Sequence, residues 1–422
     1  MSSDPYYGVE VIETGAGSAV VRARKAAVCF IIGTAPVGEV HADATERANY
    51  IQKSVIITSR GQAAKAFGEH SEGFTIPAAL DALFDQAGSN GIGEIEVVNV
   101  FDPDVHASVA DVTNLDIIGG FDAAGVPSGL KLTYDSYQKF GRFAKIVLAP
   151  GFTGLTGVRA ELETICNRIR ARAIIDAPAA VPMQQVIEAR GPTGGFDFQT
   201  NSRRLVLAWP HMKIVDLETG DETIEPYSAR LAGVWLRTVM DDGYHHSPSN
   251  RPIYGIEGSA QPVLYVPGDK QSDVQLLRNA GIVTAEERFG KGPHVSGNRS
   301  AAHPTDTDMR NFLHVQFLED ILDETVVEFL DQFKDRNASP ARIEYVEDGI
   351  NQHMKGLMTG DDPVIYDGYF RFDRTRTTKT TVAQGQFYWT LKYAPVGIME
   401  RITVDRNIDL NLISNALGLA SS

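Results

Sequence analysis

Six short runs of β-branched and other apolar residues, separated by amphipathic helical patterns, constrain the fold of this chain most. The runs are Val28–Ile32, Ser54–Ile57, Ile95–Val98, Lys145–Leu148, Ala173–Ile175 and Arg204–Leu207, and the helical patterns cover residues 76–86, 129–140, 158–170, 183–189 and 228–240. Apolar strands that alternate with helices are typical of a mostly parallel sheet covered on both faces. The sequence therefore predicts an α/β core from residues 27–100 and 141–300. Residues 101–140 are punctuated by Gly and Pro turns and predict a loop-rich excursion on that core.

The C-terminal third carries a different pattern. Residues 308–334 predict a long amphipathic helix, and Ser339–Pro340 supplies the N-cap and first-turn residues of another helix that runs to Met358. Strand patterns follow at residues 364–373, 384–393 and 397–404. An α+β unit is therefore expected over residues 301–404.

Both ends of the chain alternate apolar and polar residues outside these two units. The apolar members are Tyr7, Val9, Val11, Ile12, Ile408, Leu410 and Leu412. An isolated amphipathic strand is not stable in water, so each end must pair with a sheet edge. That edge belongs either to the same subunit or to a neighbouring one. We interpret residues 1–26 and 405–422 as terminal arms.

Bulk composition excludes several partners and compartments. The net charge of −15 argues against nucleic acid, because phosphate binding needs a dense basic patch. No stretch approaches the roughly 20 apolar residues that span a bilayer, so no membrane is expected as a partner. The two cysteines, Cys29 and Cys166, lie in apolar patterns and predict buried free thiols. No secretory signal opens the chain, so synthesis in a reducing cytoplasm is expected.

Each enzymatic interpretation lacks a necessary part. The sequence contains no dinucleotide-binding glycine motif after a strand, no phosphate-binding loop and no nucleophile elbow. His245, His246 and His353 have no companion at metal-ligand spacing, and adjacent histidines on a regular element point apart. We therefore interpret them as surface or packing residues, and predict no catalytic residue, metal or cofactor. An α/β enzyme with an unrecognised site remains the alternative from another functional class.

Two segments between the units are rich in turn residues. Pro248 and Pro252 bracket Asn250, and Asn298–Arg299 follows a glycine. Proline fixes the backbone of such a segment, and Asn tolerates left-handed conformations. We interpret these five residues as structural turns.

An ordered set of phrases along the chain resembles the tail sheath proteins of contractile-tailed bacteriophages and phage-tail-like bacteriocins. The phrases are Tyr7–Val11, Val28–Pro36, Ser54–Ser59, Ile76–Gln86, Glu96–Val100, Ala149–Phe152, Ala173–Pro178, Ser202–Arg204, Trp209–Pro210, Pro226–Arg230 and Ser247–Asn250. One phrase departs from the family. Where the family has Phe-x-x-Trp-Gly-Asn-Arg-Thr, this chain has Val295-Ser296-Gly297-Asn298-Arg299-Ser300 and lacks the Trp.

The resemblance implies a mechanical function. Copies of such a protein stack around a tail tube, contact baseplate and tail terminator proteins, and contract to drive the tube through the host envelope. It implies a subtilisin-like core without a protease site, assembly in the host cytoplasm and a final place in the virion. A bacteriocin particle or another contractile injection system is the alternative setting.

The same resemblance gives roles to particular residues. The two arms are expected to add strands to neighbouring subunits, with hinges at Gly15 and Gly17 and at Asp405 and Asn407. The helix that ends at Met358 is expected to face the tube through Arg342, His353 and Lys355. An ordinary solvated helix face is the alternative interpretation of those three residues.

Overall fold

The computed structural model describes residues 26–192, 194–196, 198–215, 220–409, 412, 416 and 417. Several predicted positions lie outside these residues, and they are Tyr7, Val9, Val11, Ile12, Gly15, Gly17 and Leu410. The helices of the described residues include none that is long and apolar enough to cross a membrane.

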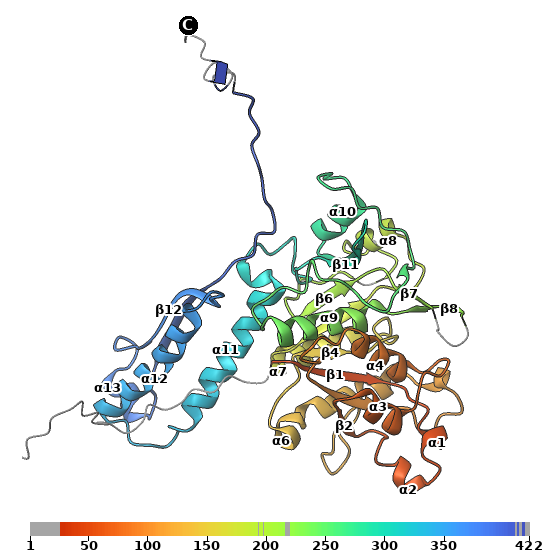
Figure 1. The fold of residues 1–422 in the computed structure, drawn as a ribbon. Coiled ribbons are helices and arrows are strands. Elements are labelled where there is room, and N and C mark those ends of the chain that lie inside the picture. The colour runs from red at the N-terminus through yellow and green to blue at the C-terminus, as the bar shows by residue number, and fades with distance from the viewer. Residues whose placement is uncertain are drawn as a thin grey trace, which may run out of the picture.

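An eight-stranded sheet forms the centre of the larger body (Figure 1). In spatial order the strands are β11 (Gly292–Ser296), β10 (Ile282–Arg288), β6 (Leu205–Ala208), β5 (Arg172–Asp176), β4 (Ile146–Leu148), β1 (Val28–Gly33), β3 (Glu94–Asn99) and β2 (Ser54–Ile57). The six inner strands run parallel, and the edge strands β2 and β11 are antiparallel to their neighbours. The predicted, mostly parallel sheet is confirmed.

Both faces of the sheet are buried, which explains why its strands are apolar without alternation. Successive residues of β1 enter different cores: Cys29 and Ile31 pack in one cluster, and Val28, Phe30 and Ile32 in the other. Helices α4 (Thr75–Asp85) and α9 (Tyr227–Asp241) contribute to the first cluster, and α7 (Val158–Ile169) contributes to the second.

Shorter elements complete this body. They are α1 (Val37–Val40), α2 (Ala44–Arg47), α3 (Arg60–Phe67), η1 (Val109–Asp111), α5 (Asn114–Ile118), η2 (Gly129–Tyr134), α6 (Ser136–Phe140), α8 (Met183–Glu188), α10 (Asp273–Asn279) and the three-stranded sheet of β7 (Met212–Val215), β8 (Glu222–Glu225) and β9 (Gly258–Ser259). The helix expected over 129–140 is instead a 3₁₀ segment followed by the short α6, with Asp135 between them. The excursion has no strand between residues 101 and 140, yet Ile117, Leu130 and Leu132 are buried in the second cluster.

The C-terminal unit lies beside this body (Figure 1). It contains η3 (Met309–Asn311), α11 (Leu313–Asp331), α12 (Pro340–Met358), β12 (Ile365–Phe372), α13 (Lys379–Ala383) and β13 (Trp389–Pro395). Ser339 caps α12 by accepting a hydrogen bond from the Arg342 N–H, as the Ser-Pro pair predicts. The predicted strand at 397–404 is wrong, because these residues are described and form no strand.

Helix α11 joins the two bodies. Leu313 and Phe317 near its start belong to the first cluster of the core, and Leu322 and Phe329 further on belong to a third cluster with α12, β12 and β13. Charged residues reinforce the junction. The carboxylate of Asp320 on α11 lies 2.7 Å from Arg172 Nη2 and 2.5 Å from Arg204 Nη1, at the amino ends of β5 and β6.

Further ion pairs repeat this pattern one turn along α11. Lys145, just before β4, pairs with Glu324, and Arg170 Nη1 lies 2.6 Å from Asp323 Oδ2. The helix thus sets a row of acids against cations at the amino ends of three parallel strands. Because Arg172 is fully buried, this row fixes how the C-terminal unit docks on the core.

A buried carboxyl on β3 makes stability depend on pH. The Glu96 side chain is buried and accepts a hydrogen bond from Ser136 Oγ at 2.8 Å. Burial raises the pKa of Glu96 from 4.5 to about 6, while hydrogen bonds from serines oppose the rise. Protonation of Glu96 therefore favours the folded state. That stabilisation is complete below about pH 4.5 and is lost as the pH rises through about 6.

Glu96→Gln is expected to remove this dependence. Relative to the unchanged protein, the variant should gain about 2 kcal/mol in free energy of unfolding between pH 4.5 and 7.5. Denaturant titrations across that range measure the difference. Glu39→Gln, on an exposed residue of α1, is the control and should leave the profile unchanged. If the difference in free energy of unfolding between Glu96→Gln and the unchanged protein stayed constant from pH 4.5 to 7.5, the raised pKa assigned to Glu96 would be contradicted.

Candidate assembly interface

The hairpin of the C-terminal unit has two different edges. β12 and β13 pair with Phe370 opposite Leu391 and Gly368 opposite Tyr393. The outer edge of β12 lies against α12, where Asn351 Nδ2 donates to the Phe370 carbonyl and Asn351 Oδ1 accepts from the Phe370 N–H, each at 2.8 Å. This side-chain pairing closes the β12 edge to another strand.

The outer edge of β13 is open. Because Phe370 turns its backbone polar groups toward α12, Leu391 and Tyr393 turn theirs away from β12. Among the described residues, β12 is the only strand that pairs with β13, so no strand lies along this outer edge. Unpaired N–H and C=O groups in a row are a template for another strand, and a two-stranded sheet gains stability from a third.

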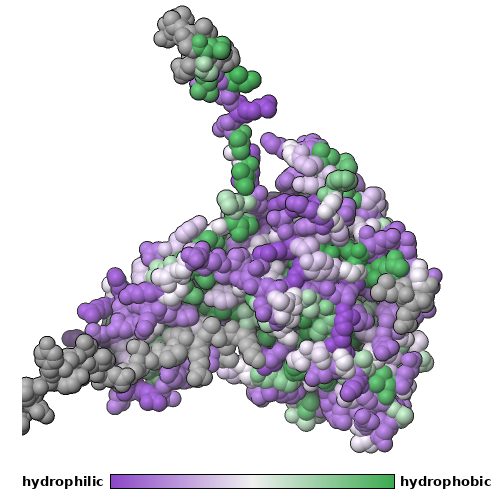
Figure 2. Space-filling view, viewed as in Figure 1, coloured by the Kyte–Doolittle hydropathy of each residue, from purple (hydrophilic) through white to green (hydrophobic). Residues whose placement is uncertain are grey.

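The chain leaves the body after this hairpin and extends away from it (Figure 1). Ile402, Val404, Ile408 and Leu412 are between 66% and 82% exposed. Figure 2 shows hydrophobic side chains, in green, along the projecting segment. The even numbering of Ile402, Val404 and Ile408 would place them on one face of an extended strand, with Arg406 breaking the series. The arm strand predicted to reach Leu412 is wrong at that residue, because Leu412 is helical. Within the described residues, none hydrogen-bonds to the backbone of 401–408.

Glu400 anchors the root of this segment. Its carboxylate lies 2.5 Å from Arg299 Nη2 and 3.4 Å from Arg278 Nη2. Burial opposes ionisation, but the hydrogen bond from Arg299 and both arginine charges hold the pKa of Glu400 below its usual value. The predicted hinge residues Asp405 and Asn407 are exposed and lie beyond this anchor. The Glu400 ion pairs therefore lie five residues before the first of them.

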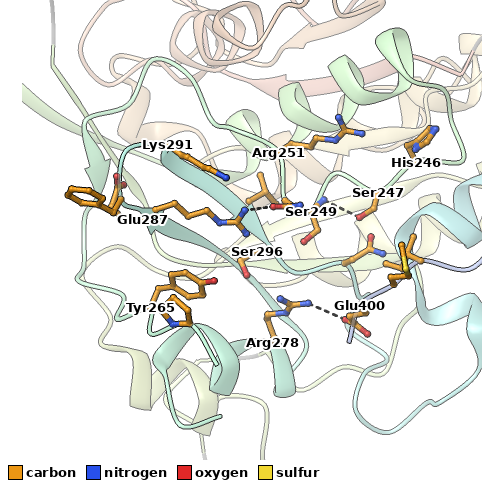
Figure 3. A pocket seen from close by; sticks show the side chains of 18 residues that line it. His246, Ser247, Ser249, Arg251, Tyr265, Arg278, Glu287, Lys291, Ser296 and Glu400 are labelled. Atoms are coloured by element: carbon orange, nitrogen blue, oxygen red, sulfur yellow. Dashed lines mark hydrogen bonds and ion pairs between the residues drawn. The ribbon is translucent and has the colours of Figure 1, made fainter. Parts of the chain in front are cut away.

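A hollow of about 970 Å³ opens beside the anchor (Figure 3). Basic side chains of Arg251, Arg278, Arg288 and Lys291 line it, together with Glu400 and residues of the β10–β11 hairpin. Arg288 also binds Glu286 and Asn250. The root of the projecting segment thus lies beside a cluster of basic side chains in a protein whose net charge is −15.

The two turn segments meet at the edge of the large sheet. Asn250 has φ +65°, and its N–H donates to the Val295 carbonyl of β11 at 2.7 Å. Pro252 pairs with His294 in an isolated bridge, and Ser249 Oγ accepts from the Gly297 N–H. Pro248 precedes these contacts. The segment therefore covers the outer edge of β11 and closes it to strand addition.

The second turn segment links that edge to α11. Asn298 lies 3.1 Å from His314 Nδ1, and its carbonyl accepts from the Leu313 N–H. Arg299 stacks on Phe312 with its guanidinium 4.2 Å from the ring centre while it binds Glu400. One short segment therefore connects the sheet, α11 and the root of the projecting chain.

The predicted tube-facing residues do not share one face of α12. Lys355 is exposed, whereas Arg342 and His353 are half-buried. Arg342 Nη1 donates to the Asn337 carbonyl, and burial lowers the pKa of His353. Of the three, Lys355 presents its charge most openly to a partner.

The strongest candidate for an enzymatic site among the described residues lacks the geometry of a catalytic triad. Asp176, His211 and Ser228 come near one another at the carboxyl end of β5 and the start of α9. However, the Ser228 N–H donates to Asp176 Oδ1 at 2.8 Å, and His211 Nε2 lies 2.9 Å from the Ala177 carbonyl. Burial of Asp176 raises the pKa of its carboxyl. Asp176 thus accepts a hydrogen bond from the first turn of α9, as a helix-capping residue does.

Comparison with known proteins decides the family. No family model matches the chain. The chain is 32% identical to the tail sheath protein of Burkholderia phage BcepMu over 484 aligned residues, which cover 97% of this chain and 98% of that protein. This chain belongs to the contractile tail sheath family. It is therefore a structural, non-enzymatic sheath subunit of a contractile tail or contractile injection system.

Other sheath proteins align over the full length. The tail sheath protein of Escherichia phage P2 is 24% identical over 420 residues, covering 100% of both chains. The fold agrees with the sheath of an extracellular contractile injection system, PVC, in its contracted state, with a TM-score of 0.65 at 15% identity, covering 98% of this chain and 100% of that one. The contracted helical sheath of the anti-feeding prophage gives the same TM-score at 17% identity, covering 95% and 99% of the two chains.

Proposed function

We propose that this sheath protein polymerises by exchanging its terminal arms between adjacent copies. The observation that carries the proposal is a matched pair within one chain: an extended segment with one apolar face, and an open strand edge at β13. Neither is satisfied by the described residues of its own subunit. Addition of the extended segment of one copy to the β13 edge of another would pair both. Main-chain hydrogen bonds would supply affinity, and alternate side chains would supply specificity.

Strand exchange suits a lattice that changes shape. A paired strand keeps its hydrogen bonds while residues beside it rotate, so subunits stay linked when the sheath contracts. The Glu400 anchor fixes one end of the C-terminal connection, and Asp405 and Asn407 provide the hinge. Gly15 and Gly17 provide the corresponding hinge at the N-terminal arm, whose strand is residues 7–12.

The remaining partners follow from the sheath role. The polymer surrounds a tail tube, contacts baseplate and tail terminator proteins, and drives the tube through a bacterial envelope on contraction. Sheath proteins of two phages are among the full-length relatives, which supports a virion component assembled in the host cytoplasm. Residues 27–300 form the core body, with 101–140 packed on it, and 301–404 the C-terminal unit. A subtilisin-like topology of the core remains a prediction from the resemblance.

Cysteine cross-linking tests arm exchange. Ile408→Cys is combined in turn with a cysteine at each position from 389 to 395 of β13, and assembled sheaths are oxidised. At least one combination should give a ladder of covalent multimers on denaturing gels, both before and after contraction. The native Cys29 and Cys166 are buried and should not contribute. Assembled sheaths that give no ladder with any combination would contradict the proposal.

The tube contact is proposed at Lys355. Lys355→Glu reverses one exposed charge on α12 and should weaken assembly on isolated tubes by a few-fold, because exposed ion pairs contribute at most about 1 kcal/mol each. Assembly without tubes should be unchanged. Lys379→Glu, an exposed lysine of α13, is the matched control. Co-sedimentation with and without tubes measures both, and an equal loss in the two assays would contradict the tube contact.

A further inference from the structure

Two adjacent histidines and a distant aspartate converge at the junction of the two bodies. Nε2 of His245 lies 3.1 Å from Asp362 Oδ2, and Nε2 of His246 lies 2.7 Å from the same oxygen. The histidines follow α9 in the core, and Asp362 lies in the turn between α12 and β12. The three donor atoms lie within 4.8 Å of one another.

The local backbone explains why neighbouring histidines point the same way. Residues 243–246 form a turn closed by a hydrogen bond from the His246 N–H to the Gly243 carbonyl at 3.2 Å. The strict alternation of a strand does not apply there, and the ring centres lie 4.3 Å apart. Gly243 makes room for this, since a Cβ there would lie 3.0 Å from the His245 ring. The sequence-based expectation that adjacent histidines diverge therefore does not hold at this turn.

We propose that His245, His246 and Asp362 form a binding site for a divalent transition-metal ion, with Zn²⁺ as the preferred class. Two imidazoles and one carboxylate are a ligand set that zinc accepts with an open fourth position. A tetrahedral ion with bonds of about 2.1 Å places its ligand atoms roughly 3.4 Å apart. The two nitrogen–oxygen separations of 3.1 and 2.7 Å are shorter than this, and an outward shift of Asp362, whose side chain is 60% exposed, would lengthen them.

Access to the site also fits a metal ion. His246 lines the hollow beside the Glu400 anchor, so water can reach the site and occupy the fourth position. Nδ1 of His245 is buried with no hydrogen-bond partner among the described residues, so no contact there prevents Nε2 from offering its lone pair. The nearby Asp242 is paired with Arg251 at 2.8 Å and does not compete.

The bound ion would clamp the C-terminal unit to the core. Its ligands come from both bodies, so coordination would add a rigid link beside α11. This role is independent of arm exchange, and either can fail without the other.

Metal titration of the tag-free full-length protein at pH 7.5 tests the site. Co²⁺ should bind with one ion per chain and give visible absorption typical of low coordination, and Zn²⁺ should displace it. Zn²⁺ should also raise the thermal unfolding midpoint. His246→Ala and Asp362→Asn should each weaken Zn²⁺ binding by more than about tenfold, as loss of a ligand does. His70→Ala, at an exposed histidine elsewhere, should bind Zn²⁺ like the unchanged protein.

Asp362→Asn lies in an exposed turn and preserves a hydrogen-bond acceptor, so it separates ligand loss from misfolding. Unchanged unfolding midpoints without metal would verify that both variants fold. The proposal is overturned if Zn²⁺ does not bind the unchanged protein at millimolar concentration. It is equally overturned if His246→Ala and Asp362→Asn bind Zn²⁺ as tightly as His70→Ala does.

Discussion

Deletion of residues 405–422 is expected to leave a folded monomer that forms no sheaths. No described residue of the body hydrogen-bonds to the backbone of 401–408, so the core and the C-terminal unit keep their contacts without the deleted residues. The deletion removes the segment that we propose as the partner strand for β13. Circular dichroism and thermal unfolding should match the full-length protein, while electron microscopy should show single particles in place of tubes. Tubes of normal dimensions would contradict arm exchange.

Two matched substitutions test whether assembly depends on the apolar face of the projecting segment and not only on the presence of the segment. Ile408→Asp places a carboxylate on the apolar face of the segment, and Asn407→Asp places the same group on the adjacent polar position. Burying an unpaired carboxylate is costly, so Ile408→Asp should raise the protein concentration needed for assembly more than about tenfold. Asn407→Asp should change it by less than about twofold. Equal effects would show that the alternation has no role in assembly.

Asp320→Asn is expected to destabilise the subunit more than any other single charge removal at this junction. The Asp320 side chain is 2% exposed and binds the fully buried Arg172 as well as Arg204. Two other nitrogens of Arg172 are buried without a hydrogen-bond partner among the described residues, so loss of the carboxylate leaves this cation uncompensated. Breaking a buried pair in this way costs about 3–5 kcal/mol. Denaturant titration of the unassembled protein measures the loss.

Asp331→Asn on the same helix is the control. Its carboxylate is 70% exposed and lies 3.6 Å from Lys334, so its removal should have no measurable effect on unfolding. If Asp320→Asn were as mild as this control, the acidic row of α11 would not be what fixes the C-terminal unit on the core.

The sheet could be predicted from the sequence because its strands are buried on both faces. Each of the six apolar runs became a strand. Five of them are inner parallel strands, which lie under two layers of helix and have no polar face to interrupt the pattern, and the sixth is the antiparallel edge strand β2. Helix α12 was also predictable, because Ser339 and Pro340 mark its start chemically and Gly360 follows its end.

Residues 397–404 show that alternation of apolar and polar residues does not specify a partner strand. The pattern identifies a segment that is able to pair as a strand, but it does not specify a partner edge. Within the described subunit these residues pair with no strand, although the outer edge of β13 is open. The strand prediction failed there for that reason. The 3₁₀ segment 129–134 was missed because apolar periodicity does not distinguish it from a short α-helix.

The junction residues were beyond sequence reasoning. Asp362 is separated from His246 by 116 residues and Asp320 from Arg172 by 148, and no spacing rule relates such pairs. Arg172 opens an apolar strand, which was the one available signal that a buried cation needed a partner. The convergence of His245 and His246 depends on a turn whose geometry the sequence alone does not determine.

Cryo-electron microscopy of sheaths assembled from this protein, in extended and contracted states, tests strand exchange most directly. We predict that residues near 404–412 of one copy lie hydrogen-bonded along the outer edge of β13 in an adjacent copy, and that this pairing is present in both states. Maps in which the same residues return to a sheet of their own subunit, with β13 unpaired, would contradict it.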